Sequence, residues 1–295
     1  MFSDGMIIKC VAGVYDVLYK GQIVSAYAAG KFRNQGISPL VGDRVEIKFS
    51  ERENEKNLIT EILPRKNALL RPPVANVDTL LITVAVKKPN PDLKLVDSLI
   101  CYCRMLDIEP IICINKCDYD IITALELKEQ FEKSDIRAFI TSTLLKEGID
   151  ELKNAIKTGI TCFSGQSAVG KSSLTNLLVG RELFETGGLS KKTERGKHTT
   201  RHSELVLFDD DKWLADTPGF SLLEAPELSP EKFKELYFEY EEYQDGCRFN
   251  GCNHVNEPDC AVRQAVEEQK LSAQRYERYK ELFNEVNEKW RRRYD

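Results

Sequence analysis

Two short motifs occur in this chain in an order that constrains its fold. Residues 115–118 read NKCD, and residues 165–172 read GQSAVGKS, which matches the pattern GxxxxGKS. Each motif directly follows an apolar run, Ile111–Ile114 for the first and Gly159–Ser164 for the second. Such runs are typical of buried strands, and α/β sheets bind ligands at the carboxyl ends of their parallel strands. The pair therefore predicts an α/β domain with both motifs along one edge of its sheet.

The GxxxxGKS segment predicts a phosphate-binding loop. Gly165 and Gly170 allow the backbone to curl tightly, so that successive N–H groups point at phosphate oxygens. In this motif the lysine, Lys171, reaches the β- and γ-phosphates, and the Ser172 hydroxyl is a ligand of magnesium. Leucines at helical spacing between residues 171 and 179 place a helix N-terminus after the loop, which favours a bound anion. The residues expected to contact nucleotide here are Gly165, Gln166, Ser167, Ala168, Val169, Gly170, Lys171, Ser172 and Ser173.

The NKCD motif predicts selection of guanine over adenine. The Asp118 carboxylate can accept hydrogen bonds from guanine N1–H and the N2 amine. Adenine offers neither donor, so a buried Asp118 would be left unpaired at a cost of about 1–3 kcal/mol or more. Asn115 is expected to tie this loop to the phosphate loop, and the stem of Lys116 to lie over the base. A second apolar strand, 138–140, ends in TST, so N–H groups around Ser142 are expected to reach guanine O6.

A third motif, DTPG at residues 216–219, completes the set in a rotated order. Asp216 follows the short strand 212–215 and can hold magnesium through water, and the Gly219 N–H can touch the γ-phosphate. In ordinary GTPases the phosphate loop comes first, DxxG second and NKxD last. The order here predicts a circularly permuted domain, in which residues 76–86 supply the strand that usually follows DxxG.

The polar segment from Thr193 to His202 lies between the phosphate loop and DTPG and suits a switch loop. A threonine of such a loop ligates magnesium only when the γ-phosphate is present. Thr200 is the first candidate for this ligand and Thr199 the second, and a plain surface loop is the alternative. Contacts at Thr200 and Gly219 would order both switch segments and reposition residues 224–295.

The segment after DTPG lacks the glutamine with which Ras-like enzymes orient the attacking water. Phe220 follows Gly219 directly, and the next three residues are Ser, Leu and Leu. Unassisted hydrolysis is therefore expected to be slow, with the missing group supplied by another loop or by a partner. His198 of the switch segment is a candidate for positioning water, and a solvated loop histidine is the alternative. Lys171 and Thr200 complete the candidate catalytic residues.

Three of the nine cysteines cluster with one of the three histidines in the pattern CxxxxCxHxxxxxC at residues 247–260. Three thiolates and one imidazole leave no coordination position open, which is typical of a structural zinc site. The histidine and the compact spacing favour zinc over an iron–sulfur cluster. The other cysteines are scattered, mostly in apolar contexts, and are expected to be small core residues. The predicted zinc ligands are Cys247, Cys252, His254 and Cys260.

Three regions differ in their pattern along the chain. Residues 1–68 contain short β-rich runs at 6–19, 22–28 and 43–49 among glycines, which predicts an OB-like barrel of about five strands. Its charge balance is only slightly positive, so RNA binding and structural docking are both open. After a linker-like stretch at 64–73, residues 69–223 alternate apolar strands with amphipathic helices, among them 93–105 and 121–133. This pattern predicts a mostly parallel sheet with helices on both faces. Residues 224–295 have helical patterns at 230–243, 260–269 and 272–293 around the cysteine cluster, and the aromatic stripe of the last is expected to be core. The fold class is thus multidomain α/β.

Composition restricts what the chain can bind. With a net charge of −5, 30% charged residues and 42% hydrophobic residues, it is typical of a soluble globular protein. There is no global basic footprint, so any contact with nucleic acid would be local. The sequence has no signal peptide and no apolar run long enough for a membrane span, and its cysteine count is odd. We therefore expect a cytoplasmic, monomeric protein without membrane contact.

The motifs together resemble the circularly permuted bacterial GTPase family known as RsgA, YjeQ or YloQ. The resemblance extends over the whole chain and rests on NKCD (115–118), GQSAVGKS (165–172), RGKHTTR (195–201), DTPG (216–219) and CxxxxCxHxxxxxC (247–260). It implies an OB barrel, a permuted P-loop GTPase domain that uses GTP with Mg²⁺, and a C-terminal domain with one Zn²⁺. It also implies binding to the small (30S) ribosomal subunit and its 16S rRNA, a role in late subunit maturation, and slow hydrolysis of GTP to GDP and phosphate that the subunit stimulates.

Two other functions stay open at this point. A GTPase of the same construction could act on another RNA or on a protein partner. A non-enzymatic RNA-binding scaffold could hold GTP as a structural ligand, in which case Lys171→Ala would retain function. The identity of the complex that stimulates GTP turnover would distinguish the first alternative from a role in ribosome assembly.

Overall fold

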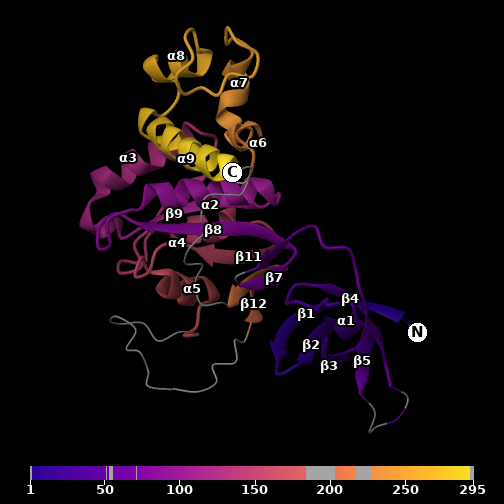
Figure 1. Cartoon of the computed structure of the whole chain (residues 1–295). Coiled ribbons are helices and arrows are strands. Elements are labelled where there is room, and N and C mark those ends of the chain that lie inside the picture. Colours follow the sequence, from indigo (N-terminus) through magenta and orange to yellow (C-terminus); the bar gives the residue numbers. More distant parts are fainter. Residues whose placement is uncertain are drawn as a thin grey trace.

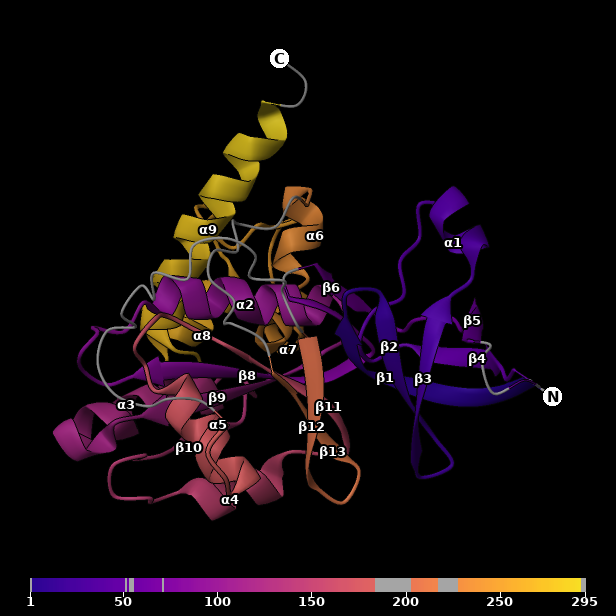
Figure 2. The same cartoon turned by 90° about the horizontal axis from the view of Figure 1, so that it is seen from below.

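A computed structural model of the chain describes residues 2–50, 52, 56–70, 72–183, 203–216 and 228–292. A barrel, an α/β domain and a helical module follow one another along the chain (Figure 1). The C-terminal helices lie on helix α2 (Leu93–Met105), which separates them from one face of the central sheet, and the barrel lies beside the sheet (Figures 1 and 2). The predicted fold class is confirmed.

The N-terminal barrel is closed by pairing of its first and fourth strands. Strand β1 pairs with both β2 and β4, and β5 joins β4 to β3. The sequence predicts one continuous run from residue 6 to 19, but the chain turns at Ala12 and Gly13, where φ is 48° and 81°. The described elements here are β1 (Phe2–Val11), β2 (Val14–Tyr19), β3 (Gln22–Ala28), α1 (Gly30–Asn34), β4 (Arg44–Lys48) and β5 (Asn57–Ile62).

The central sheet has the strand order β10-β9-β8-β11-β13-β12 in the described part of the chain. All neighbours are parallel except β12, which is antiparallel to β13. Strand β8 pairs with β11, so the strand from residues 76–86 does occupy the place that the rotated order predicts. The strands are β8 (Val77–Ala85), β9 (Glu109–Asn115), β10 (Ala138–Ile140), β11 (Gly159–Ser164), β12 (Ser203–Asp209) and β13 (Lys212–Asp216).

Helices cover both faces of this sheet, as predicted. Buried side chains of α2 (Leu93–Met105) and α3 (Ile121–Glu132) belong to the same core as Val84 and Ile112. Those of α4 (Ile149–Ala155) and α5 (Lys171–Val179) form a separate core on the other face. A short 3-10 helix, η1 (Cys117–Tyr119), contains the end of the NKCD motif.

The barrel and the central sheet are joined by strand pairing. The second half of β1 pairs with β12, with Lys9 opposite Glu204 and Cys10 opposite Ser203. The Lys9 Nζ lies 2.7 Å from the Glu204 Oε2. A small hairpin of β6 (Ala68–Leu70) and β7 (Pro73–Ala75) replaces the linker that the sequence predicts between the two domains.

The C-terminal module packs around one long helix, α9 (Ala273–Arg291). Its predicted aromatic stripe is core: Tyr276, Tyr279 and Phe283 are buried. The sequence predicts one helix from 230 to 243, but Tyr237 leaves the helical region (φ −99°, ψ 76°), and Arg104 of α2 donates to the preceding Leu236 carbonyl. The segment therefore divides into α6 (Pro230–Lys234), η2 (Phe238–Tyr240) and α7 (Glu241–Gln244), and α8 (Ala261–Glu267) follows.

Among the described residues, no helix combines the length and the apolar character that a membrane span requires.

Candidate functional site

The NKCD motif and the phosphate loop meet at one edge of the sheet. Strands β8, β9 and β11 are parallel neighbours, so the residues after their carboxyl ends lie side by side. Asn115 ends β9, and Gly165 follows β11 directly. The backbone of Asp216 ends the parallel strand β13 at the same edge. The shared edge that the motifs predict is therefore present despite their rotated order.

The two motif glycines of the phosphate loop occupy positions that a larger residue cannot take. Gly165 has φ 126°, and a Cβ there would lie 2.1 Å from the Thr83 carbonyl oxygen. Gly170 has φ 102°, and a Cβ there would lie 2.3 Å from the Asn115 Nδ2. The loop thus curls closely against the ends of its neighbouring strands, and α5 begins at Lys171.

Lys171 points its side chain back over the phosphate loop. Its Nζ donates to the Gly165 carbonyl oxygen at 2.8 Å and also to the Gln166 carbonyl oxygen. Burial lowers the pKa of Lys171 to about 8, because removal from water disfavours the charged ammonium. A cation that is partly dehydrated in this way is electrostatically suited to a phosphate.

Asn115 joins the base-side loop to the phosphate loop, as the sequence predicts. Its side chain is fully buried, and its Nδ2 donates to the Val169 carbonyl oxygen at 2.8 Å. Its Oδ1 accepts from the Thr141 hydroxyl and from the Thr143 N–H, each at 3.2 Å. One amide therefore fixes three loops, and two of its partners, Thr141 and Thr143, flank Ser142 in the loop that the sequence predicts to contact the base.

A loop after β8, which the sequence analysis did not connect with the site, also reaches this edge. The Lys116 Nζ donates to the Ala168 carbonyl oxygen at 2.8 Å and to the Lys88 carbonyl oxygen. Burial lowers the pKa of Lys116. The Asp92 N–H donates to the Gln166 Oε1 at 3.0 Å. The segment from Lys88 to Asp92 therefore contacts both nucleotide motifs.

Asp118 differs from the expectation of burial, because its side chain is exposed. The Ser142 hydroxyl donates to the Asp118 Oδ1 at 2.5 Å. The Ser142 N–H donates to the Glu147 carbonyl oxygen at 3.1 Å, so this N–H is already engaged. Ser142 therefore orients Asp118 through its hydroxyl, while its own N–H stays within the loop, so the predicted contact with guanine O6 would come from a neighbouring N–H.

Some of the other predicted nucleotide residues are described by the structure, and some are not. Ser167, Ala168 and Ser172 are exposed along the loop and the first turn of α5, and Ser173 is half-buried. Several predicted residues lie outside the described part of the chain: His198, Thr199, Thr200 and Gly219.

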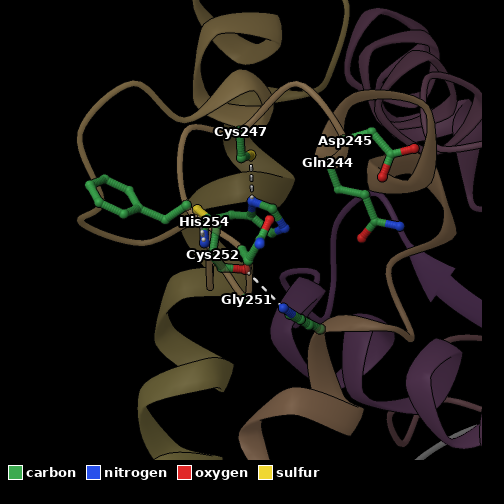
Figure 3. Close-up of a pocket in the computed structure, with 9 residues that line it drawn as sticks. Gln244, Asp245, Cys247, Gly251, Cys252 and His254 are labelled. Carbon is green, nitrogen blue, oxygen red and sulfur yellow. Dashed lines mark hydrogen bonds between the residues drawn. The ribbon is translucent and has the colours of Figure 1, made fainter.

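The four predicted metal ligands come together in the C-terminal module. Figure 3 shows three of them, Cys247, Cys252 and His254. Their ligand atoms lie within 4.8 Å of one another. The Cys247 Sγ is 3.9 Å from the Cys260 Sγ and 3.6 Å from the His254 Nδ1, and the Cys260 Sγ is 3.4 Å from that nitrogen. Tetrahedral zinc with ordinary bond lengths requires S···S of about 3.8 Å and S···N of about 3.6 Å. The donor set and its spacing fit a tetrahedral metal ion.

The electrostatics of the cluster suit a bound divalent cation. Burial raises the pKa of the Cys252 thiol to about 12, and nearby thiols add to this effect. Burial, with Lys234 nearby, lowers the pKa of His254 to about 4, so its imidazole is neutral at pH 7. A bound divalent cation reverses the first effect because it stabilises thiolates, and it needs the neutral imidazole.

A carboxylate that the sequence analysis did not single out holds the ligand loop in place. Glu257 accepts from the N–H groups of Asn253 at 2.9 Å and of Val255 and Asn256 at 3.0 Å. Burial raises the pKa of Glu257, but these hydrogen bonds lower it overall. The Tyr276 hydroxyl donates to the His254 carbonyl oxygen at 2.7 Å. Glu257 and Tyr276, which are not metal ligands, therefore help to orient the ligand loop.

Comparison with known proteins agrees with this architecture. The family model described as RsgA GTPase matches residues 62–226, and the model of the RsgA N-terminal domain matches residues 4–57. Two curated relatives carry the name small ribosomal subunit biogenesis GTPase RsgA. The one from Caldanaerobacter subterraneus is 45% identical over 99% of this chain and 98% of its own, and the one from Agathobacter rectalis is 42% identical over 96% and 97%.

Two solved structures share the fold over nearly the full length. YjeQ from Thermotoga maritima is 33% identical with a TM-score of 0.82, covering 97% of this chain and 99% of its own. YloQ, described as a circularly permuted GTPase, is 30% identical with a TM-score of 0.80, covering 98% and 96%. With its motifs in rotated order on one sheet edge and matches of this extent, the chain belongs to the RsgA family of circularly permuted GTPases.

Proposed function

We propose that this protein hydrolyses GTP while bound to the small ribosomal subunit and assists the late maturation of that particle in the cytoplasm. The observation that carries the proposal is the Asn115 bridge, which joins a guanine-type loop to a phosphate loop across the permuted chain. The names of the relatives support the ribosomal partner. Phe220 in place of a glutamine suits an enzyme whose turnover depends on that partner.

The nucleotide would lie along the edge formed by the NKCD and phosphate loops. Asp118, oriented by Ser142, would accept from guanine N1–H and the N2 amine. Because Asp118 is exposed, it would discriminate guanine from adenine only once the base covers its carboxylate and removes water from it. Lys116 would line the base, and Lys171 would turn from the loop carbonyls to the β- and γ-phosphates.

Magnesium and the attacking water would lie beside the γ-phosphate. Ser172, Thr200 and, through water, Asp216 are the proposed magnesium ligands, with Gly219 contacting the γ-phosphate. Bound Mg²⁺ neutralises charge on the phosphates. His198 is the proposed group for positioning water, and the subunit would complete its placement.

The outer modules are proposed to make the ribosomal contacts. On the barrel, the Lys56 Nζ lies 4.0 Å from the centre of the Tyr27 ring, and Ile23 is exposed nearby on the same strand as Tyr27. An aromatic ring with a lysine above it suits stacking and phosphate contact with 16S rRNA. We propose domain limits of 1–68, 69–223 and 224–295, a monomer, and zinc as the metal of the C-terminal module.

Phosphate release from GTP, with ATP as the control nucleotide, tests the proposal. We expect slow turnover of GTP alone and strong stimulation when purified small ribosomal subunits are added. Turnover that is indifferent to the subunit would point to another partner. No turnover in either condition would point to a scaffold that binds GTP without hydrolysing it.

The substitution Asp118→Asn is expected to weaken GTP binding by about 10- to 150-fold, since it removes charge-assisted hydrogen bonds of about 1.5–3 kcal/mol. An asparagine offers one acceptor and one donor, which matches xanthine with its N1–H and O2. Xanthosine triphosphate should therefore bind the variant more tightly than GTP does in a competition titration. Asp120→Asn is the matched control, because Asp120 caps α3 and pairs with Lys87. Equal weakening by both substitutions would contradict the assignment of Asp118.

A further inference from the structure

A buried cluster of charges joins the C-terminal module to α2 of the GTPase domain. Asp97 of α2 lies between Arg275 and Arg278 of α9 and forms ion pairs with both. Glu239 of η2 accepts from the Arg275 Nε at 2.6 Å and from the Arg104 Nη1 of α2 at 3.0 Å. The exposed fraction of these five side chains is between 0% and 12%.

These groups fix a geometry more than they add stability. Buried ion pairs recover little free energy beyond the cost of dehydrating both partners, but breaking one leaves an uncompensated charge. Burial raises the pKa of Glu239, yet Arg275 and Arg104 lower it overall, so the carboxylate is ionised at neutral pH. The cluster therefore allows α9 only a narrow range of orientations relative to α2.

The cluster is also incompletely satisfied. Three arginines face two carboxylates. Within the described part of the chain, the Nη2 atoms of Arg275 and Arg278 are buried without a hydrogen-bond partner. A network with unpaired donors can gain by rearranging when its surroundings shift, whereas a fully paired one cannot. This contact is thus more responsive to a displacement of α2 than an apolar contact would be.

Helix α2 connects this cluster to the phosphate loop. The Asp92 side chain caps α2 by accepting from the Leu95 N–H, and the Asp92 N–H donates to the Gln166 Oε1 of the phosphate loop. Asp97 lies five residues further along, about 7.5 Å at the rise of an α-helix. Lys94, between them, pairs with Glu285 of α9. Helix α2 therefore touches the phosphate loop through its N-cap residue and α9 through Lys94 and Asp97.

We propose that the charge cluster of Asp97, Arg104, Glu239, Arg275 and Arg278 couples the C-terminal module to the phosphate loop through α2. The inference rests on nucleotide binding at that loop, as proposed above. Nucleotide that displaces Gln166 shifts Asp92 and α2, and the cluster passes the shift to α9. Because coupling is reciprocal, a ligand on the C-terminal module changes nucleotide affinity by the same factor. The barrel is attached elsewhere, through β1 and β12, and lies outside this route.

Hydrogen exchange of the full-length protein with GDP and with a non-hydrolysable GTP analogue tests the coupling. In the unsubstituted protein, exchange of α9 amides should differ between the two nucleotides. In Asp97→Asn, which keeps the side-chain volume, this difference should disappear at α9 while protection of the phosphate loop by nucleotide persists. Affinity for the GTP analogue should fall by about fivefold, the low end of common coupling factors.

Two further variants supply a second test of the cluster and a control outside it. Arg278→Met removes one partner of Asp97 at a site that is 12% exposed, and it should reproduce the loss if Asp97→Asn fails to fold. Glu268→Gln removes an exposed carboxylate that pairs with Lys270 beside the end of α8, outside the cluster and outside α2, and should leave the α9 difference intact. An α9 difference that survives both cluster substitutions would overturn the coupling. Nucleotide that protects the loop but never α9 would also overturn it, whereas nucleotide that protects neither would overturn the proposed function as well.

Discussion

Replacing Lys171 by alanine is expected to weaken GTP binding by about 10- to 150-fold, from the loss of a charge-assisted contact worth about 1.5–3 kcal/mol. Turnover of bound GTP should fall by a further factor of about 10²–10³, since the lysine also stabilises charge that develops in the transition state. The physical basis is its position: a half-buried ammonium directly over the loop that would hold the phosphates. Equilibrium titration and single-turnover phosphate release measure the two effects separately.

The dependence on pH distinguishes this role from a general loss of folding. Burial lowers the pKa of Lys171 to about 8, and a bound polyanion would raise it because it favours the charged form. GTP affinity should therefore be level below about pH 7 and should decrease by about fivefold from pH 8 to pH 9, as Lys171 of the free protein loses its proton. Lys171→Ala should lack this decrease.

Folding stability should respond to the same group with the opposite sign. The folded pKa of Lys171 is depressed below its unfolded value of about 10.4, so the unfolded chain binds more protons between pH 8 and 10. The contribution of Lys171 to stability therefore rises with pH in that window, while GTP affinity falls. Lys212→Ala is a suitable control, since Lys212 begins β13 at the opposite edge. A pH dependence of GTP affinity that persists in Lys171→Ala would refute the assignment.

Local patterns were sufficient to predict the elements that carry the motifs. Helix α2 has its predicted bounds because apolar residues recur at helical spacing and Asp92 caps its first turn. The Asn115 bridge was predictable because both motifs end parallel strands, and the edge of a parallel sheet brings such ends together. Each inference needs only nearby residues and one rule of sheet topology.

The contacts that the sequence did not reveal join residues far apart in the chain. Asp97 and Arg275 are separated by 178 positions, and each occurs in an amphipathic helix where a charge is ordinarily solvated. Their burial follows from how α9 docks on α2, which no local pattern encodes. Ser142 was predicted to lie near the base, but the sequence did not reveal the loop bridge to Glu147 that occupies its N–H. Glu257 was missed because a carboxylate between ligands has no distinctive spacing.

Removing the metal is expected to unfold residues 228–292 while the sheet of the GTPase domain stays folded. Cys252 and Cys260 are buried in the same core as Phe233, Val262 and Tyr276, so the ligand loop and α9 depend on each other. Apparent binding free energies of structural zinc are about 10–16 kcal/mol in small domains, which matches or exceeds the whole stability of about 5–15 kcal/mol that such domains have. The free energy of metal binding is thus large enough to decide whether this module folds.

Cys252→Ala and treatment with a strong chelator should give the same result. Hydrogen exchange should become fast throughout α6, α8 and α9, and elemental analysis should show the loss of one zinc per chain. Cys103→Ala is the matched control: Cys103 is buried in α2 but remote from the ligands, so it should cost about 1 kcal/mol and retain the metal. Iron in place of zinc, with visible absorbance, would contradict the proposed identity of the metal.

The metal-free protein would also distinguish two proposed roles of the C-terminal module: its effect on nucleotide binding and its part in stimulation by the small subunit. If the charge cluster couples α9 to the phosphate loop, unfolding the module should weaken nucleotide binding only about as much as Asp97→Asn does, near fivefold. Stimulation by the small subunit should be lost to a much greater extent, because a surface proposed to contact the subunit is then absent. Full stimulation of the metal-free protein would show that the barrel alone transmits the signal through β1 and β12.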